Sequence, residues 1–264
     1  MSIPAYLVLG TPGSGRCGVV DDVIAKAMGE NDFCAVFISR NEAPTDFDKK
    51  IASAPNAGFV HYAGLEDAAE KMLALDENKI THVFYIADST KSLADEVENF
   101  KLLVDGGKIR LARIWSLIDC GMLYFFQNET QAYADALSHF ADCLLLSRRS
   151  YVPNKFVNDL MLRYEKMRQP HLVELVDKNF RVAHPIELLI EEARRITMIF
   201  DDFDPIDELD LDEENLPEEP FSLERKPDPY MLRLNNGMRA KPLPDVSEYA
   251  AKARELESAE NENL

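Results

Sequence analysis

The sequence predicts an α/β fold with a doubly wound, mostly parallel sheet, helices on both faces and an acidic C-terminal tail. Two observations predict it. Short apolar runs alternate with helical stretches through the first two hundred residues, and the first run leads directly into a glycine-rich turn. Alternation of this kind forms parallel sheets covered on both sides. Ligands of such sheets bind beyond the carboxyl ends of the strands, which is where this turn is expected.

The elements follow in order from their apolar patterns. The runs that predict strands cover residues 6–9, 33–39, 58–62, 82–87, 110–118, 143–146 and 171–176. The stretches that predict helices cover residues 15–28, 65–75, 93–104, 130–140 and 155–168. A short Ala-rich helix is expected at residues 247–258, capped by Ser247. We therefore expect one domain over residues 1–198 and an acidic, partly disordered extension over residues 199–264.

The charge restricts the possible partners. The 264 residues carry a formal net charge of −18, and residues 201–224 contain no Lys or Arg. Such a chain repels nucleic acid and anionic membranes, so neither is expected as a partner. The sequence shows no signal-type start and no run long enough to span a bilayer. The 4 cysteines are scattered, with neither zinc-site nor disulfide spacing, and we expect a cytoplasmic protein.

The turn after the first strand is a phosphate loop with two chemical positions changed. The pattern G-x-x-x-x-G-K-[ST] is met by Gly10 and Gly15, but Arg16 stands at the lysine and Cys17 at the Ser/Thr. The backbone can still present N–H groups to an anion. A planar guanidinium does not replace an ammonium at a tight site, and a thiol is a poor ligand for Mg²⁺. The alternative is a tight turn without a ligand.

A second pattern overlaps the first. Residues 13–18 read G-x-G-x-x-G, the dinucleotide-binding fingerprint, and Tyr151 and Lys155 have the Tyr-x-x-x-Lys spacing of short-chain dehydrogenases. Arg40, after the second strand, suits the 2′-phosphate of NADP. However, Pro153 stands where that family needs a helix interior. An NADP-dependent dehydrogenase remains a second alternative.

The motifs taken in order resemble the CobW-like branch of the phosphate-loop GTPases, near HypB and UreG. Ile-Ala-Asp-Ser-Thr-Lys-Ser-Leu-Ala-Asp at residues 86–95 is similar to that family's Glu-Ser/Thr-Thr-Gly-Leu-Ala-Asp-Pro segment, with one residue inserted. Residues 113–119 resemble its strand ending in Val-Val-Asp-Ala, and residues 136–150 its segment ending in Asn-Lys-x-Asp. The resemblance covers residues 1–190 and implies a P-loop NTPase fold. Its candidate nucleotide-binding residues are Gly10, Gly13, Ser14, Gly15, Arg16, Cys17, Gly18, Asp88, Asp119 and Arg148.

The departures from the family matter as much. Ser147, Arg148, Arg149 and Ser150 replace Asn-Lys-x-Asp, so the carboxylate that accepts from guanine is missing. Residues 58–62 replace the family's metal-binding Gly-Cys-x-Cys-Cys, and only His61 there could ligate a metal. We therefore assign no metal site. The arginines either bind an anionic ligand or pair with the chain's own carboxylates, and Asp119 either faces a ligand or caps a helix.

These observations favour a degenerate relative of the CobW-like GTPases that binds a nucleotide or an unknown protein partner with little or no hydrolysis. GTP or another nucleotide is the expected ligand, while Mg²⁺ is disfavoured and no catalytic residue is assigned. The first alternative is an active GTP-dependent metallochaperone. The oligomeric state stays open.

Overall fold

The computed structural model describes residues 2–201 and 227–262. The chain separates into two compact units: Met1–Ile196 with Leu243–Leu264, and Thr197–Pro242. Within the second unit, an isolated antiparallel bridge joins Arg233 to Arg239. The domain boundary at residue 198 stays a prediction, and most of the acidic stretch 201–224 lies outside the described residues.

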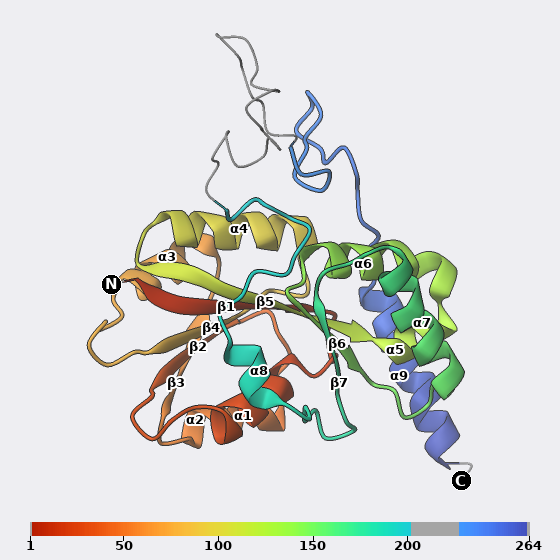
Figure 1. The fold of residues 1–264 in the computed structure, drawn as a ribbon, viewed down its shortest axis with the longest axis horizontal. Coiled ribbons are helices and arrows are strands. Elements are labelled where there is room, and N and C mark those ends of the chain that lie inside the picture. Colours follow the sequence, from red (N-terminus) through yellow and green to blue (C-terminus); the bar gives the residue numbers. More distant parts are fainter. Residues whose placement is uncertain (1, 202–226, 263–264) are drawn as a thin grey trace, which may run out of the picture. The chain divides into compact units, whose positions relative to one another are not determined.

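The first unit contains a seven-stranded sheet in which every pairing is parallel, and the predicted doubly wound fold is thereby confirmed (Figure 1). Its order is β3-β2-β4-β1-β5-β6-β7. The strands are β1 (Ile3–Gly10), β2 (Cys34–Ser39), β3 (Ala57–Tyr62), β4 (His82–Ile86), β5 (Ile109–Asp119), β6 (Cys143–Ser147) and β7 (Leu172–Leu175). All seven predicted strands are present, with ends shifted by a few residues at most.

The strand order also decides between two interpretations of the glycine-rich turn. Here β4 lies between β2 and β1, whereas the dinucleotide-binding fold places its first strand between the second and fourth, in the order 3-2-1-4-5-6. Tyr151 lies in a turn and Pro153 caps the following helix, so Tyr151 and Lys155 do not share a helix. The dehydrogenase interpretation is therefore wrong.

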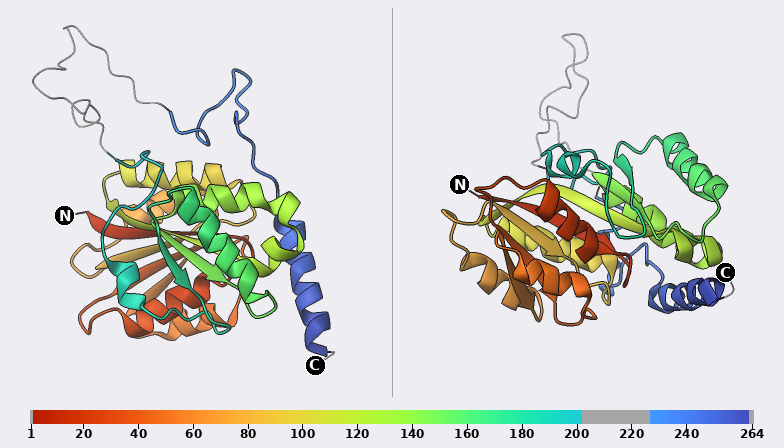
Figure 2. Two further views of the ribbon diagram at one scale, coloured as in Figure 1. Left: turned by 45° about the vertical axis from the view of Figure 1, so that its right-hand side comes forward. Right: turned by 90° about the horizontal axis from the view of Figure 1, so that it is seen from below.

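Helices cover both faces of this sheet, with α1 and α2 over one face and α3 and α4 over the other (Figures 1 and 2). The helices are α1 (Arg16–Lys26), α2 (Asp46–Ser53), α3 (Leu65–Leu73), α4 (Leu93–Asp105), α5 (Cys120–Phe125), α6 (Gln127–Phe140), α7 (Asn154–Lys166), α8 (Pro185–Leu189) and α9 (Ser247–Glu262). The sequence did not predict α2, α5 and α8, which are the three shortest of these.

The core explains why α1 follows β1 so closely. Val19, Val20 and Val23 of α1 are completely buried in one cluster with Tyr6 and Val8 of β1. Burial of such side chains contributes about 1.5–3 kcal/mol each. The turn between strand and helix is therefore held from both sides by apolar packing, independently of any ligand.

The C-terminal helix belongs to the same compact unit as the sheet. The predicted helix at residues 247–258 is confirmed and continues to Glu262. It packs against α5 through the buried Ala250 and Ala253, and Val246 just before the helix is buried as well. Within residues 2–201 and 227–262, no helix is long and apolar enough to cross a bilayer.

Candidate functional site

The candidate site lies at the carboxyl edge of the sheet, where β1 ends and α1 begins. Gly13 and Gly15 have left-handed φ values of 73° and 95°, which favour glycine. The Ser14 hydroxyl is buried and donates to the carbonyl of Thr11 at 2.8 Å. A Cβ added at Gly15 would overlap the ring of Phe180. The loop thus has the glycine-dependent course that the sequence predicts.

The side chain at the lysine position is committed to contacts inside the protein. Arg16 is 5% exposed; its Nη2 donates to Oε2 of Glu42 at 2.8 Å, and its Nη1 to the carbonyl of Ala87 at 2.5 Å. The other oxygen of Glu42 accepts from the N–H of Ser89 at 2.6 Å. Burial lowers the pKa of Arg16, but the neighbouring Glu42 raises it by more, so the net shift is upward. Arg16 is therefore a permanent cation in a buried ion pair, and it joins the ends of β2 and β4.

The groups nearest to this ion pair are the thiol of Cys17 and the carboxylate of Asp88. Burial raises the pKa of the Cys17 thiol to about 12, so the side chain stays a neutral, soft thiol. Asp88, which the sequence singles out, is buried and accepts hydrogen bonds from Ser39, Asn41 and Thr90. Mg²⁺ requires hard oxygen ligands in octahedral geometry. Of these two side chains, only the carboxylate of Asp88 offers such oxygens, and three side chains already donate hydrogen bonds to it.

A second cluster of charges surrounds Asp119 at the end of β5. Asp119 is completely buried and caps α5, because its Oδ1 accepts from the N–H of Met122 at 2.9 Å. Its Oδ2 accepts no hydrogen bond from the described residues and lies 3.6 Å from Nε of Arg148. Burial raises the pKa of Asp119 to about 6, although Met122 and Arg148 oppose the shift. The helix-cap alternative is therefore present, next to an incompletely paired buried carboxylate.

Arg148 connects this cluster to the glycine-rich loop and to α9. It has a left-handed φ of 53°, and its Nη1 lies 3.4 Å from the carbonyl of Gly13. Its Nη2 forms an ion pair with Glu257, which is 3% exposed. Of the three arginines that the sequence offers as anion ligands, Arg16, Arg148 and Arg149, the first two are thus paired with carboxylates of the chain itself.

Two neighbours of Arg148, Ser147 and Arg149, form hydrogen bonds within the protein. The Ser147 hydroxyl donates to the carbonyl of Ile118 at 3.1 Å, and Nε of Arg149 donates to the carbonyl of Val176 at 3.2 Å. These bonds join β6 to its neighbours on both sides. None of them requires a nucleotide base.

Four residues at this edge were not found from the sequence. Glu42 and Phe180 contact the loop and α1, and Arg254 and Glu257 reach the same edge from α9. Nη1 of Arg254 donates to the carbonyl of Pro12 at 2.5 Å. None of them belongs to a motif, and three are ordinary charged residues in a chain rich in them. The approach of a distant helix gives no local sequence signal.

His61 is the one potential metal ligand that the sequence singles out at residues 58–62. His61 in β3 is exposed, and its ring lies 5.1 Å from that of Phe59 in an edge-to-face contact. Among residues 2–201 and 227–262, no group of three or more His, Cys, Asp or Glu side chains could hold a metal ion.

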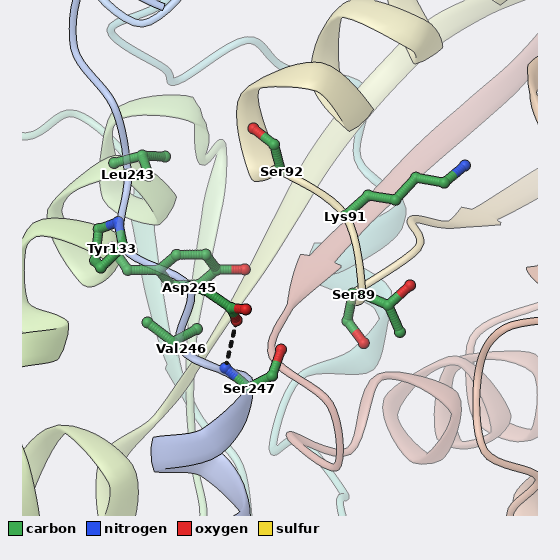
Figure 3. A pocket seen from close by; sticks show the side chains of 10 residues that line it. Ser89, Lys91, Ser92, Tyr133, Leu243, Asp245, Val246 and Ser247 are labelled. Carbon is green, nitrogen blue, oxygen red and sulfur yellow. Dashed lines mark hydrogen bonds between the residues drawn. The ribbon is translucent and has the colours of Figure 1, made fainter.

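A cavity of about 200 Å³ lies beside the site, between the β4–α4 loop, α6 and the start of α9 (Figure 3). The hydroxyl of Tyr133 points into it, and Ser89 lines the side that belongs to the β4–α4 loop. Across the cavity, Asp245 accepts a hydrogen bond from the N–H of Ser247 at 2.9 Å. The segment leading into α9 therefore forms one wall of this cavity.

Comparisons with known proteins support the fold. No protein-family model and no curated protein matches this chain. Among solved structures, it is similar to a Zn(II)-bound triple mutant of the YjiA GTPase, with 17% identity over 72% of this chain and 62% of that chain and a TM-score of 0.51. The Zn(II)-bound YjiA GTPase from E. coli follows at 15% identity, with the same coverage of both chains and a TM-score of 0.46.

A third solved structure is the signal recognition particle receptor FtsY from Elizabethkingia anophelis in complex with GDP. It is 9% identical over 77% of this chain and 65% of its own length, with a TM-score of 0.49. The chain thus spans less than two thirds of each of these proteins. The likeness to the YjiA triple mutant, together with the strand order, confirms the P-loop NTPase type of α/β fold.

Proposed function

We propose that this chain is a degenerate relative of the CobW-like GTPases that binds a nucleotide or a partner protein and hydrolyses GTP slowly or not at all. The observation that carries the proposal is the position of Arg16. Its guanidinium is turned into a buried ion pair with Glu42 and a bond to the carbonyl of Ala87. A side chain held in this way does not reach across the loop to a terminal phosphate.

The position of Arg16 matters because of the chemistry of phosphoryl transfer. Such transfer depends on a cation that neutralises the β- and γ-phosphates and on Mg²⁺ held by the loop's Ser or Thr. In this chain the cation neutralises Glu42, and the Mg²⁺ ligand is replaced by the buried thiol of Cys17. Both contributions are lost together, and hydrolysis at an ordinary GTPase rate is not expected.

A nucleotide can still bind to a loop that does not support hydrolysis, because binding uses the backbone N–H groups of the loop and of α1. The loop still opens α1, whose N-terminal N–H groups favour an anion. The guanine-reading carboxylate is absent, since Ser150 takes its place. We therefore expect any nucleotide to bind weakly and with little preference for guanine over adenine.

The experiment is a calorimetric titration of nucleotide-stripped protein with GTP, GDP, ATP and NADPH, with and without Mg²⁺, together with a phosphate-release assay. The expected result is weak or absent binding that Mg²⁺ does not strengthen, and no phosphate release above the buffer. Magnesium-dependent release of phosphate from GTP that falls in an Arg16→Ala variant would contradict the proposal. The double variant Arg16→Lys/Cys17→Ser is expected to remain inactive, because Glu42 would still pair with the new lysine.

The metallochaperone alternative has weaker support. The YjiA neighbours are Zn(II)-bound, but the described part of this chain holds no comparable group of ligands. An unknown protein partner and a cytoplasmic location belong to the proposal instead. The net charge of −18 favours a basic protein surface as the partner.

A further inference from the structure

The C-terminal helix α9 lies against the edge of the sheet at which ligands of this fold bind. Two of its side chains reach the residues that the sequence assigns to a nucleotide. Arg254 contacts the glycine-rich loop: it donates to the carbonyl of Pro12, and a Cβ added at Gly13 would overlap its guanidinium. Glu257 pairs with Arg148, one turn further along the helix. Both contacts come from the same helix. Arg254 is about 240 residues from Pro12 in the sequence, and Glu257 is about 110 residues from Arg148.

These contacts occupy the places of a nucleotide's polar groups. Phosphates bind to the backbone N–H groups of such a loop. The guanidinium of Arg254 fills the space over Gly13, beside these groups, where an added Cβ would overlap it. Position 148 belongs to the altered base-reading motif, and its guanidinium is neutralised by Glu257. A ligand carrying phosphate and a polar base would need the space and the partners that α9 takes.

The helix is held by a small apolar contact. Along α9 the buried apolar side chains are Ala250 and Ala253, while Leu256 is 43% exposed. Alanine has few apolar atoms to bury, so each contributes less than the 1.5–3 kcal/mol of a larger core side chain. The ring of Tyr249 lies 5.4 Å from that of Phe126. Such a helix depends on its packing, because short helices are marginal on their own in water.

The polar contacts of α9 carry an electrostatic cost. Glu257 is buried near Asp119, and each of these carboxylates has one oxygen without a hydrogen bond from the described residues. Its proximity contributes to the raised pKa of Asp119, and burial lowers the pKa of Arg254. Removing α9 from this edge would free Arg148 and expose Asp119 to water. The contact is therefore suited to being exchanged for another ligand.

We propose that α9 is an intramolecular competitor that keeps nucleotide out of the candidate site until it is displaced. This inference rests on the proposed function, in that it assumes that the loop can still hold a nucleotide. It adds that the weak binding expected of the full chain comes largely from occupation by α9. A diphosphate such as GDP is the minimal ligand, because it needs neither the Mg²⁺ ligand nor the γ-phosphate contact of Arg16.

The test uses two full-length variants with the same substitution at neighbouring positions. Ala250→Asp places a carboxylate in the contact between α9 and α5, whereas Ala251→Asp places it on the exposed side of the same helix. Binding of a fluorescent N-methylanthraniloyl GDP is measured for both and for the unaltered chain, and unlabelled GDP is used to compete. Hydrogen exchange of residues 247–259 reports separately whether α9 has left.

We expect Ala250→Asp to expose α9 to exchange and to bind GDP at least tenfold more tightly than the unaltered chain, with Ala251→Asp unchanged in both measurements. If α9 becomes unprotected and GDP affinity does not rise, the inference is overturned. It is also overturned if the unaltered chain binds GDP tightly while α9 stays protected. The proposed lack of hydrolysis is tested separately by phosphate release, and neither outcome bears on it.

A second variant covers the case in which Ala250→Asp does not fold. Arg254→Ala removes the bond to Pro12 and the guanidinium over Gly13, and it introduces no buried charge. We expect a several-fold gain in GDP affinity, and Glu255→Ala on the exposed side serves as the control. A loss of affinity in Arg254→Ala would show that this arginine assists binding and would refute competition by α9.

Discussion

Replacing Arg16 with methionine tests whether this residue is a phosphate ligand or part of the folded structure. An ordinary P-loop lysine faces its ligand, so the nucleotide-free protein is little affected by losing it. Arg16 instead forms hydrogen bonds to Glu42 and to the carbonyl of Ala87, and the side chains of the pair are 5% and 10% exposed. Methionine keeps the apolar stem but leaves Glu42 buried without its counter-ion.

The expected loss follows from the burial of the pair. Removing one partner of a buried ion pair costs about 3–5 kcal/mol, because the other charge remains uncompensated. For a unit of this size, each kcal/mol shifts the midpoint of thermal unfolding by about 2–4 °C. We therefore expect Arg16→Met to lower the midpoint by about 6–20 °C. The double variant Arg16→Met/Glu42→Met should lose less than the single variant, since replacing both partners by apolar groups is often neutral.

The assay is thermal and urea unfolding of the nucleotide-free protein, followed by circular dichroism. Arg40→Met is the control, because Arg40 is exposed and follows the same strand; we expect a change within about 0.5 kcal/mol. If Arg16→Met unfolds within 2 °C of the unaltered chain, Arg16 is not held as described. The argument that it is unavailable to a phosphate would then fail as well.

Three further predictions concern the same edge. Because the pKa of Asp119 is raised to about 6, the folded protein holds this proton to higher pH than the unfolded chain does, and the free energy of unfolding falls as pH rises from about 4 to 6. Asp119→Asn keeps the cap and should therefore have a higher free energy of unfolding in urea than the unaltered chain at pH 7.5, by up to about 3 kcal/mol. At pH 5 the difference should be clearly smaller. Gly18→Ala should destabilise the unaltered chain, because the new Cβ would lie 2.5 Å from Cβ of Phe180. In a Phe180→Gly background the same substitution should be neutral or stabilising. If Gly18→Ala lowers the urea midpoint by the same amount in both backgrounds, this explanation is contradicted. All 4 cysteines are buried, and the pKa of Cys17 is raised to about 12, so the native protein at pH 8 should not react with 5,5′-dithiobis(2-nitrobenzoate). The urea-unfolded protein should release four equivalents of the thionitrobenzoate product. Rapid reaction of Cys17 in the native protein would show that the loop is open.

The sequence predicts the elements whose apolar pattern is local and strong. Residues 33–38 of the strand predicted at residues 33–39 are all apolar, and every residue of the observed β2 is buried, as expected of an interior parallel strand. The helix α2 was missed for the opposite reason: only Ile51 is buried in it, and its start depends on a capping box between Thr45 and Asp48. Short helices with a single buried residue leave little periodicity to detect.

The sequence likewise predicts some features of the candidate site and not others. The order of its motifs along the chain is enough to predict that Gly10, Asp88 and Asp119 lie at one edge, because the carboxyl ends of parallel strands meet there. The partners of the charged residues could not be predicted, since Glu42 and Glu257 are two carboxylates among 47 acidic residues. Which of them reaches an arginine depends on how loops and α9 pack, and packing has no local signal.

The glycines of the loop show how a phosphate-binding sequence pattern can be required by the packing of the chain alone. A Cβ at Gly10 would lie 2.7 Å from the Ser14 hydroxyl, and one at Gly15 would overlap Phe180, so the chain's own packing requires both glycines. Neither requirement involves a nucleotide. Gly13 differs, because the group that fills its open side is Arg254 of α9. The packing of the fold therefore requires the first two glycines, while the space over Gly13 is filled by a side chain from the opposite end of the chain.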